Sequence, residues 1–456
     1  MDAILRRAGR WGGVDEEKGD RVTSRIAAVT TRTAPVGRSE GKDTTSSRQQ
    51  TGMPAVSHGV GFWFAAVAFA VLMAFGTAPT PLWPLYEQRD GFGATTVTVA
   101  FAVLVVGTSV GFVALGHLSD RFGRRRVVVP ALGVGIAAAL VLVFWTGLPG
   151  LLTGRLLNGL AIGLMASTAT TYLHDLHRQA HPGRPGSRLP GVVATMANLG
   201  GLAMGPLIAG AVAQWAPHPL TVTQAGFALA MVVCLGMALS TPETVDRTER
   251  DQGRPARFAL RPGTGALFGS AVGLGFFSFA LLGLVSSLGA TMLRVSFGVS
   301  SHFVAGAAPF AMFAASAMAQ LVVGGLRVEV MTALGTVVFP LGLGLVALSL
   351  HEMALWLFLL AVSLAGAGAG MLFKSGFEGA ANSAVDSSRA GVLAMYFVAG
   401  YLGMGLPAIL FSIVIVHGVP VETATIGFSA VLSVGAVTAA VLGRRAGIRL
   451  SAASVV

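Results

Sequence analysis

Long apolar runs alternate with short polar gaps along most of the chain. The first set of runs covers roughly 58–82, 95–116, 127–147, 149–172, 189–214 and 220–240. The second set covers roughly 264–290, 302–326, 329–349, 353–374, 390–416 and 421–443. Each run is long enough to cross about 30 Å of hydrocarbon as a helix that rises about 1.5 Å per residue. The pattern therefore predicts twelve transmembrane helices.

Composition indicates that the solvent of this chain is a bilayer. The 456 residues are 54% hydrophobic and 11% charged, which leaves too little charge to cover a soluble surface. A large soluble helical protein is the alternative, but its buried helices would break into shorter apolar runs. We therefore predict an all-α integral protein of the lipid bilayer.

Polar stretches divide the chain into parts. Residues 1–56 show no sustained apolar period and lack the short apolar segment of a signal peptide, so we predict a disordered cytoplasmic tail. Met53 is an alternative start. Residues 241–263 form an Arg-rich linker that we expect to be cytoplasmic. The predicted parts that remain are an N-terminal six-helix bundle at 57–240, a C-terminal six-helix bundle at 264–445 and a cytoplasmic tail at 446–456.

The charge pattern predicts orientation. Most Lys and Arg outside the N-terminal tail lie in gaps on one side, which explains the net charge of +11 without a nucleic-acid partner. Arg89 and Arg294 alone fall in gaps on the other side. We therefore expect a multi-pass protein of the inner (plasma) membrane with both termini in the cytoplasm. The 28 Arg against 3 Lys, beside 61 Gly, favour a bacterial source.

Several kinds of chemistry find no support in the sequence. The single cysteine, Cys234, lies inside an apolar run, so neither a disulfide framework nor a thiol-ligated metal is expected. There is no phosphate-binding loop and no metal-spaced cluster of His or Cys. We expect no enzyme activity, no catalytic residues, no cofactor, no metal site and a monomeric protein.

The gap between the second and third runs carries the strongest motif. It reads Gly116-His117-Leu118-Ser119-Asp120-Arg121-Phe122-Gly123-Arg124-Arg125-Arg126. This resembles the major facilitator superfamily signature Gly-x-Leu-x-Asp-Arg-x-Gly-Arg-Arg. Physically, the glycines permit a tight turn, and Asp120 can accept charge-assisted hydrogen bonds. A positive-inside anchor is the alternative for the arginines. The resemblance implies a latch that stabilises one conformation of alternating access, formed by Gly116, Asp120, Arg121, Gly123, Arg124 and Arg125.

The same resemblance implies a fold. Members of the superfamily have twelve transmembrane helices in two pseudo-symmetric six-helix bundles, with the substrate site near the midplane between them. Glycines and a proline in the fifth run recur in the eleventh, as two related halves would show. We expect this fold here.

The fourth run carries a second motif around its one arginine. Arg155, Asn158 and Gly159 share one helix face, and they resemble the helix-4 motif Arg-x-x-Gln-Gly of the family, with Asn in place of Gln. A charge inside a span costs about 2.5–3.5 kcal/mol unless it is satisfied, so it must meet polar groups. The resemblance makes Arg155 and Asn158 candidates for proton coupling or substrate binding. The alternative is that Arg155 snorkels or braces backbone carbonyls.

The fifth run resembles the motif Gly-x-x-x-Gly-Pro-x-x-Gly-Gly of drug:proton antiporters. Alanine replaces one of its glycines, and small residues recur every four positions, which also suits plain helix packing. Pro206 favours a kink. The residues that carry this packing and antiporter motif are Gly201, Gly205, Pro206 and Gly210, with Gly159 from the fourth run.

The outer end of the first run contains an aromatic segment but no central carboxylate. The stretch from Pro79 to Glu87 resembles the Pro-Leu-Tyr segment of such exporters, and its Trp83 and Tyr86 also suit interface anchors. By these run limits no Asp or Glu lies at the centre of a span, and Arg155 is the one basic residue well inside a span. Together the motifs favour the twelve-helix drug:proton antiporter type.

The preferred function is therefore proton-coupled efflux of a small amphipathic compound or drug. The first alternative is a proton symporter or uniporter that imports a nutrient such as a sugar or organic acid, because a fold does not fix a function. A membrane sensor or scaffold that does not transport is the second alternative. We expect the partners to be a small-molecule substrate and, for the antiporter and the symporter, protons.

Overall fold

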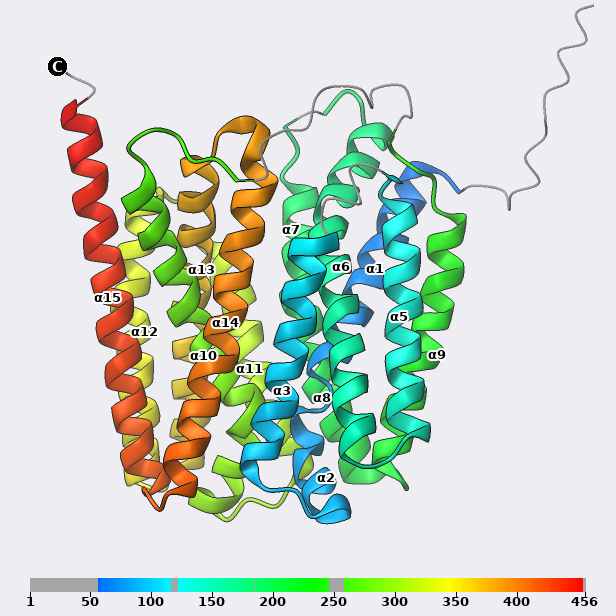
Figure 1. Ribbon diagram of the computed structural model, residues 1–456, viewed down its shortest axis with the longest axis vertical. Coiled ribbons are helices and arrows are strands. Elements are labelled where there is room, and N and C mark those ends of the chain that lie inside the picture. The colour runs from blue at the N-terminus through cyan, green and yellow to red at the C-terminus, as the bar shows by residue number, and fades with distance from the viewer. Residues whose placement is uncertain (1–55, 116–121, 185, 246–257, 454–456) are drawn as a thin grey trace, which may run out of the picture. The chain divides into compact units, whose positions relative to one another are not determined.

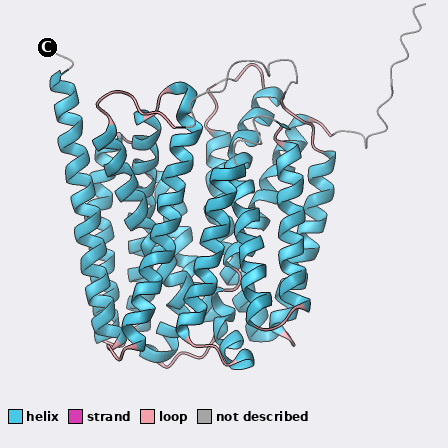
Figure 2. Ribbon diagram, in the orientation of Figure 1, coloured by secondary structure: helices cyan, strands magenta, loops and turns pink. Residues whose placement is uncertain are grey.

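Residues 56–115, 122–184, 186–245 and 258–453 are described by a computed structural model (Figure 1). These residues form helices joined by loops (Figure 2). The predicted tail at 1–56 lies, except for its last residue, outside the described part. So do Gly116, Asp120 and Arg121 of the predicted latch.

The first half of the chain folds into six spans, some of them built from two or three pieces. The pieces are α1 (His58–Thr77), η1 (Thr80–Leu82), α2 (Trp83–Asp90), α3 (Ala94–Val110), η2 (Gly111–Leu115), α5 (Arg125–Phe144), α6 (Leu148–Ala180), α7 (Leu189–Thr195), η3 (Met196–Gly200), α8 (Gly201–Trp215) and α9 (Pro219–Ser240). Here η1 is a 3-10 turn, and η2 and η3 are π-helical turns that continue α3 and connect α7 to α8.

The second half supplies the other six spans. Its elements are α10 (Gly265–Phe297), α11 (His302–Val322), α12 (Val328–His351), α13 (Leu355–Ser383), the 3-10 turn η5 (Asp386–Ser388), α14 (Arg389–Val416) and α15 (Val421–Ala453). The helices run side by side in Figure 1, where α2 marks the outer end that the charge pattern predicts, at the bottom of the view.

The predicted fold class is confirmed. In the described part of the chain, twelve helices are long and apolar enough to cross a membrane. Several limits are wrong, because polar residues end an apolar run without ending a helix. The fourth helix continues to Ala180, the tenth to Ser383 and the twelfth to Ala453, while the first helix breaks after Thr77.

Glycines set the closest approaches within the first half. A Cβ on Gly159 would collide with the backbone of Leu104 and Thr108, and one on Gly163 would collide with Gly111. Helices α6 and α3 therefore touch backbone to backbone, which a larger side chain would prevent. The predicted packing position Gly159 thus lies in a helix contact.

Two helix pairs make the most extensive contacts between the halves. Helix α3 packs against α14, and α8 packs against α11. In the second pair, Gly210 and Gly306 face each other so closely that a Cβ on Gly210 would lie 3.2 Å from the Cα of Gly306. The halves thus meet through a nearly bare backbone contact near the outer end.

Candidate functional site

The break in the first span creates unsatisfied backbone groups inside the membrane. Helix α1 ends at Thr77, and the last carbonyls of a helix have no partner within it. The fourth helix supplies partners: Arg155 Nη1 donates to the Gly76 carbonyl at 3.2 Å, and Asn158 Nδ2 donates to the Phe75 carbonyl at 3.4 Å. The two predicted site residues therefore cap helix α1 from the side.

Arg155 also lies beneath an aromatic ring that reaches the other half. Its side chain is buried, and its guanidinium carbon lies 5.6 Å from the centre of the Trp83 ring, a distance typical of a cation–π contact. Trp83 Nε1 donates to the Ser286 carbonyl of α10 at 3.3 Å. The interpretation of Trp83 as an interface anchor is wrong, since its ring is 1% exposed.

A second buried pair adjoins this segment. Tyr86 accepts a 3.4 Å hydrogen bond from Gln224 Nε2 of α9. Because Tyr86 is only 2% exposed, the interpretation of this residue as an interface anchor is also wrong. Sequence reasoning missed Gln224, because one amide in an apolar run gave no motif.

Several polar atoms of this region lack a hydrogen-bond partner among the described residues. They are Arg155 Nε, Asn158 Oδ1, Gln224 Oε1, Thr223 Oγ1 and Ser286 Oγ. Buried polar groups are nearly always paired, so these atoms are available to a water molecule, an ion or a substrate. We call Arg155, Asn158, Tyr86 and Gln224 the outer polar cluster.

The described part of the signature loop is tied to its own half. Gly123 has φ +111°, a conformation that favours glycine, and it lies directly against the Glu243 carboxylate. The Arg124 backbone N–H donates to Glu243 Oε1 at 2.8 Å, and its guanidinium lies 3.5 Å from Asp175. Arg125 donates to the Thr241 carbonyl at 3.2 Å. These bonds connect the loop to the ends of α6 and α9.

Glu243 was missed because it falls at the start of the predicted polar linker. The preceding Pro242 carbonyl accepts a 2.6 Å hydrogen bond from Tyr172, so the chain is fixed here as it leaves α9. The loop residues and the outer polar cluster are not brought together. Asp175 follows Arg155 by twenty residues of one helix, which is about 30 Å.

Close packing accounts for the motif of the fifth span. Gly201 lies against Ala70 of α1, and a Cβ on Gly205 would collide with the backbone of Ala74 and the hydroxyl of Thr77. Pro206 is inside α8, and the Gly306 backbone fits against its carbonyl. The small residues of the motif thus allow α8 to pack closely against α1 of its own half and against α11 of the other half.

The outer end also carries polar contacts between halves. Arg294 of α10 binds Glu87 of α2 at 2.7 Å, with side chains 38% and 14% exposed. Gln214 of α8 accepts hydrogen bonds from the Ser301 hydroxyl at 3.1 Å and the His302 N–H at 3.0 Å. In this conformation the halves are therefore fastened together at the outer end.

The tenth helix extends past two charged residues at the end of its predicted run. Lys374 precedes the end of α13 by nine residues, and Glu378 follows it one turn later. Both side chains are half-buried. The predicted run ends at Lys374, nine residues before the helix does.

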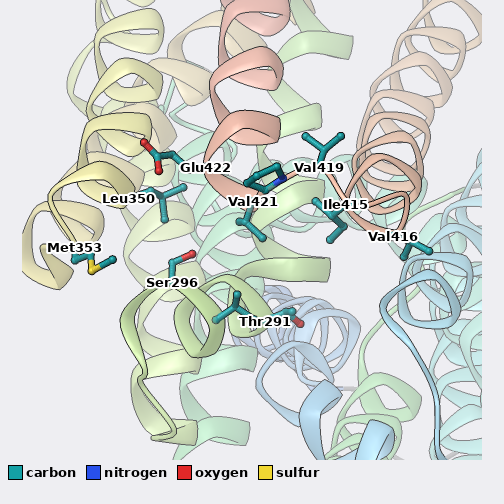
Figure 3. A pocket seen from close by; sticks show the side chains of 12 residues that line it. Thr291, Ser296, Leu350, Met353, Ile415, Val416, Val419, Val421 and Glu422 are labelled. Carbon is teal, nitrogen blue, oxygen red and sulfur yellow. The ribbon is translucent and has the colours of Figure 1, made fainter.

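Two surface cavities lie apart from the predicted site residues. One of about 560 Å³ opens at the outer end of α10, α12, α14 and α15 (Figure 3). Its lining is mainly aliphatic, and Glu422 at its edge binds His351 at 3.0 Å. The other, of about 370 Å³, lies where α1 begins and α6 ends, beside His177 and His181.

The family follows from a match over most of the chain. The sequence model of the Major Facilitator Superfamily matches residues 62–408. The chain belongs to this superfamily. A solved structure, that of a mutant of the nucleoside transporter NupG, superposes on 84% of this superfamily member and 99% of that chain with a TM-score of 0.65. At 12% identity the likeness shows the fold alone.

Curated relatives match over shorter stretches. The glucose transporter GlcP of Staphylococcus epidermidis is 37% identical over 23% of either chain. The 4-hydroxybenzoate transporter PcaK of Pseudomonas putida is 32% identical over 20% of either chain. The chain thus spans about a quarter or less of these relatives' length. The superfamily consists of transporters, which are not enzymes, so the prediction of no enzyme activity is confirmed. These findings show that the chain is a member of the superfamily, but they do not show that it is of the drug:proton antiporter type.

Proposed function

We propose that the chain is a proton-coupled secondary transporter that moves a small amphipathic organic molecule by alternating access. The outer polar cluster carries this proposal. It places Arg155, Asn158 and Gln224, with spare hydrogen-bonding atoms, at a helix break beside the contact between the halves. Helix breaks of this kind form substrate and ion sites in transporters.

The rest of the predicted latch fits this proposal. Gly123, Arg124 and Arg125 connect the ends of α6 and α9, so the loop stiffens the first half as one body. We propose that Gly116, Asp120 and Arg121 complete the latch. The proposal includes a plasma-membrane location, cytoplasmic termini, a bacterial source and a monomer.

Two directions of transport have support. Export in exchange for protons is the first candidate, because the fifth-span motif resembles that of drug:proton antiporters. Uptake is the second, because relatives include an arabinose-proton symporter of Bacillus subtilis, 34% identical over 16% of either chain, and the glucose and 4-hydroxybenzoate transporters. The close-packing role of Gly201, Gly205 and Gly210 would serve either direction.

Flux in proteoliposomes tests the proposal. Internal pH and labelled amphiphiles, glucose, arabinose and 4-hydroxybenzoate would be followed under imposed proton gradients. We expect gradient-dependent flux that Arg155→Ala and Asp120→Asn abolish, while Arg445→Ala, at an exposed position of α15, leaves it intact. Substrate moving against protons means export, and movement with protons means uptake. Flux that ignores the gradient would refute proton coupling, and no flux of any compound would favour a sensor.

A further inference from the structure

Seven aromatic rings form a connected patch between the halves. Phe112 stacks on Phe397 with ring centres 4.8 Å apart and planes 8° apart, and it lies 5.8 Å from Tyr401. Phe279 lies 5.0 Å from Phe373 and 5.5 Å from Tyr401. We name this set the aromatic patch; its members are Phe112, Phe279, Phe373, Phe377, Tyr396, Phe397 and Tyr401.

The patch draws on both halves and is only partly covered. Phe112 comes from η2 of the first half, and the other rings come from α10, α13 and α14 of the second. Phe112 and Tyr396 are buried, whereas Phe373, Phe377 and Phe397 are half-buried, so ring surface remains for a further contact. A patch that spans both halves suits a ligand carried between them.

An ammonium group lies between two residues of the patch in the sequence of α13. Lys374 precedes Phe377 by three residues, which places both on one side of α13. Its Nζ donates to the Gln320 carbonyl at 3.3 Å, and among the described residues no carboxylate lies within 4.0 Å of it. The ammonium lies beside Gly324 in the turn that follows α11, and it interacts electrostatically with Glu378 one turn along α13. An ammonium has three N–H donors, and the Gln320 carbonyl takes one of them. Lys374 therefore retains capacity for an anion.

We propose that the aromatic patch and Lys374 bind an aromatic monocarboxylic acid, which is the substrate class of the transporter. This rests on the function proposed above. The patch offers ring faces and edges at the 4.5–7 Å spacings of aromatic pairs. The Lys374 ammonium supplies charge-assisted hydrogen bonds to the carboxylate. Glu378, one turn beyond Lys374, repels a second negative group, so a monoacid binds better than a diacid.

Equilibrium binding of labelled 1-naphthoate to the purified full chain in detergent tests the substrate class. Unlabelled benzoate should compete at least about tenfold better than cyclohexanecarboxylate, which has the charge without the ring, and better than the diacid terephthalate. Lys374→Ala should weaken binding about tenfold or more. Lys374→Arg should retain part of the affinity, and Phe397→Leu should lose several-fold. Arg327→Ala removes an exposed charge at the start of α12 and should change nothing.

Three results would overturn the substrate class. They are stronger competition by benzylamine than by benzoate, equal affinity of Lys374→Ala and Arg327→Ala, and equal competition by cyclohexanecarboxylate. Flux measured on the same preparations separates the two proposals. Transport of another compound without binding of aromatic acids would refute the substrate class alone. Lys374-dependent binding without flux would support the site and refute transport.

Discussion

The ion pair between Glu87 and Arg294 should hold the outer end closed. It joins α2 of the first half to α10 of the second at 2.7 Å. The pair is partly solvated, so removing it should cost the closed state about 0.2–1 kcal/mol. That free energy corresponds to an increase of about 1.4- to 5-fold in the open population.

Cysteine labelling measures this population. Ser286→Cys places a thiol beneath the Trp83 contact, where the serine is buried. The one native thiol, Cys234, is buried and gives little background. In this background Arg294→Gln should raise the rate of labelling by an impermeant maleimide about 1.4- to 5-fold.

Two further variants make the labelling result decisive. Reversing the pair with Glu87→Arg and Arg294→Glu should restore the slow rate. Arg89→Gln removes the same charge from α2, but Arg89 binds Asp90 of its own half at 2.7 Å, so the rate should not change. An Arg294→Gln rate equal to that of the parent, or to that of Arg89→Gln, would refute the closing role of this pair.

Two further predictions concern stability in detergent, measured as the melting temperature. Gly159→Ala should destabilise by about 1–3 kcal/mol, because its Cβ meets the Leu104 backbone, which cannot move aside. Gly133→Ala in α5 has no neighbour within 4 Å and should not destabilise; equal losses at both positions would contradict this reasoning. Glu243→Ala removes charged hydrogen bonds to Arg124 and Thr244 and should cost about 1.5–3 kcal/mol. The exposed Glu352→Ala should cost almost nothing, and a comparable loss there would show that Glu243 has no special role.

Hydrophobic runs were sufficient to predict the spans but not all their ends. Lys374 and Glu378 lower the local hydropathy, yet α13 continues past both to Ser383, because the backbone hydrogen bonds of a helix do not depend on whether its side chains are apolar. The same limitation applies to the first span. The predicted run continues to residue 82, whereas α1 ends at Thr77 and a 3-10 turn that contains Pro81 follows.

Individual residues of the candidate site could be predicted from the sequence, but the groups that they contact could not. Arg155 and Asn158 were identifiable as polar groups that needed partners inside a span. Those partners are the carbonyls of Phe75 and Gly76, which every residue possesses and which become available only where a helix ends. The roles of Gln224 and Glu243 could likewise not be predicted without the fold. Gln224 binds Tyr86 and Glu243 binds Arg124, and both partners are distant in the sequence.

The bare contact between Gly210 and Gly306 bears on how the halves can move. Side chains that interlock across a helix interface must leave their grooves before one helix can turn against the other. At this point neither α8 nor α11 presents a side chain, and the backbones touch directly. The two helices can therefore roll over each other by small rotations without unpacking. The contact is suited to serve as a pivot that remains in place while the ends of the halves separate.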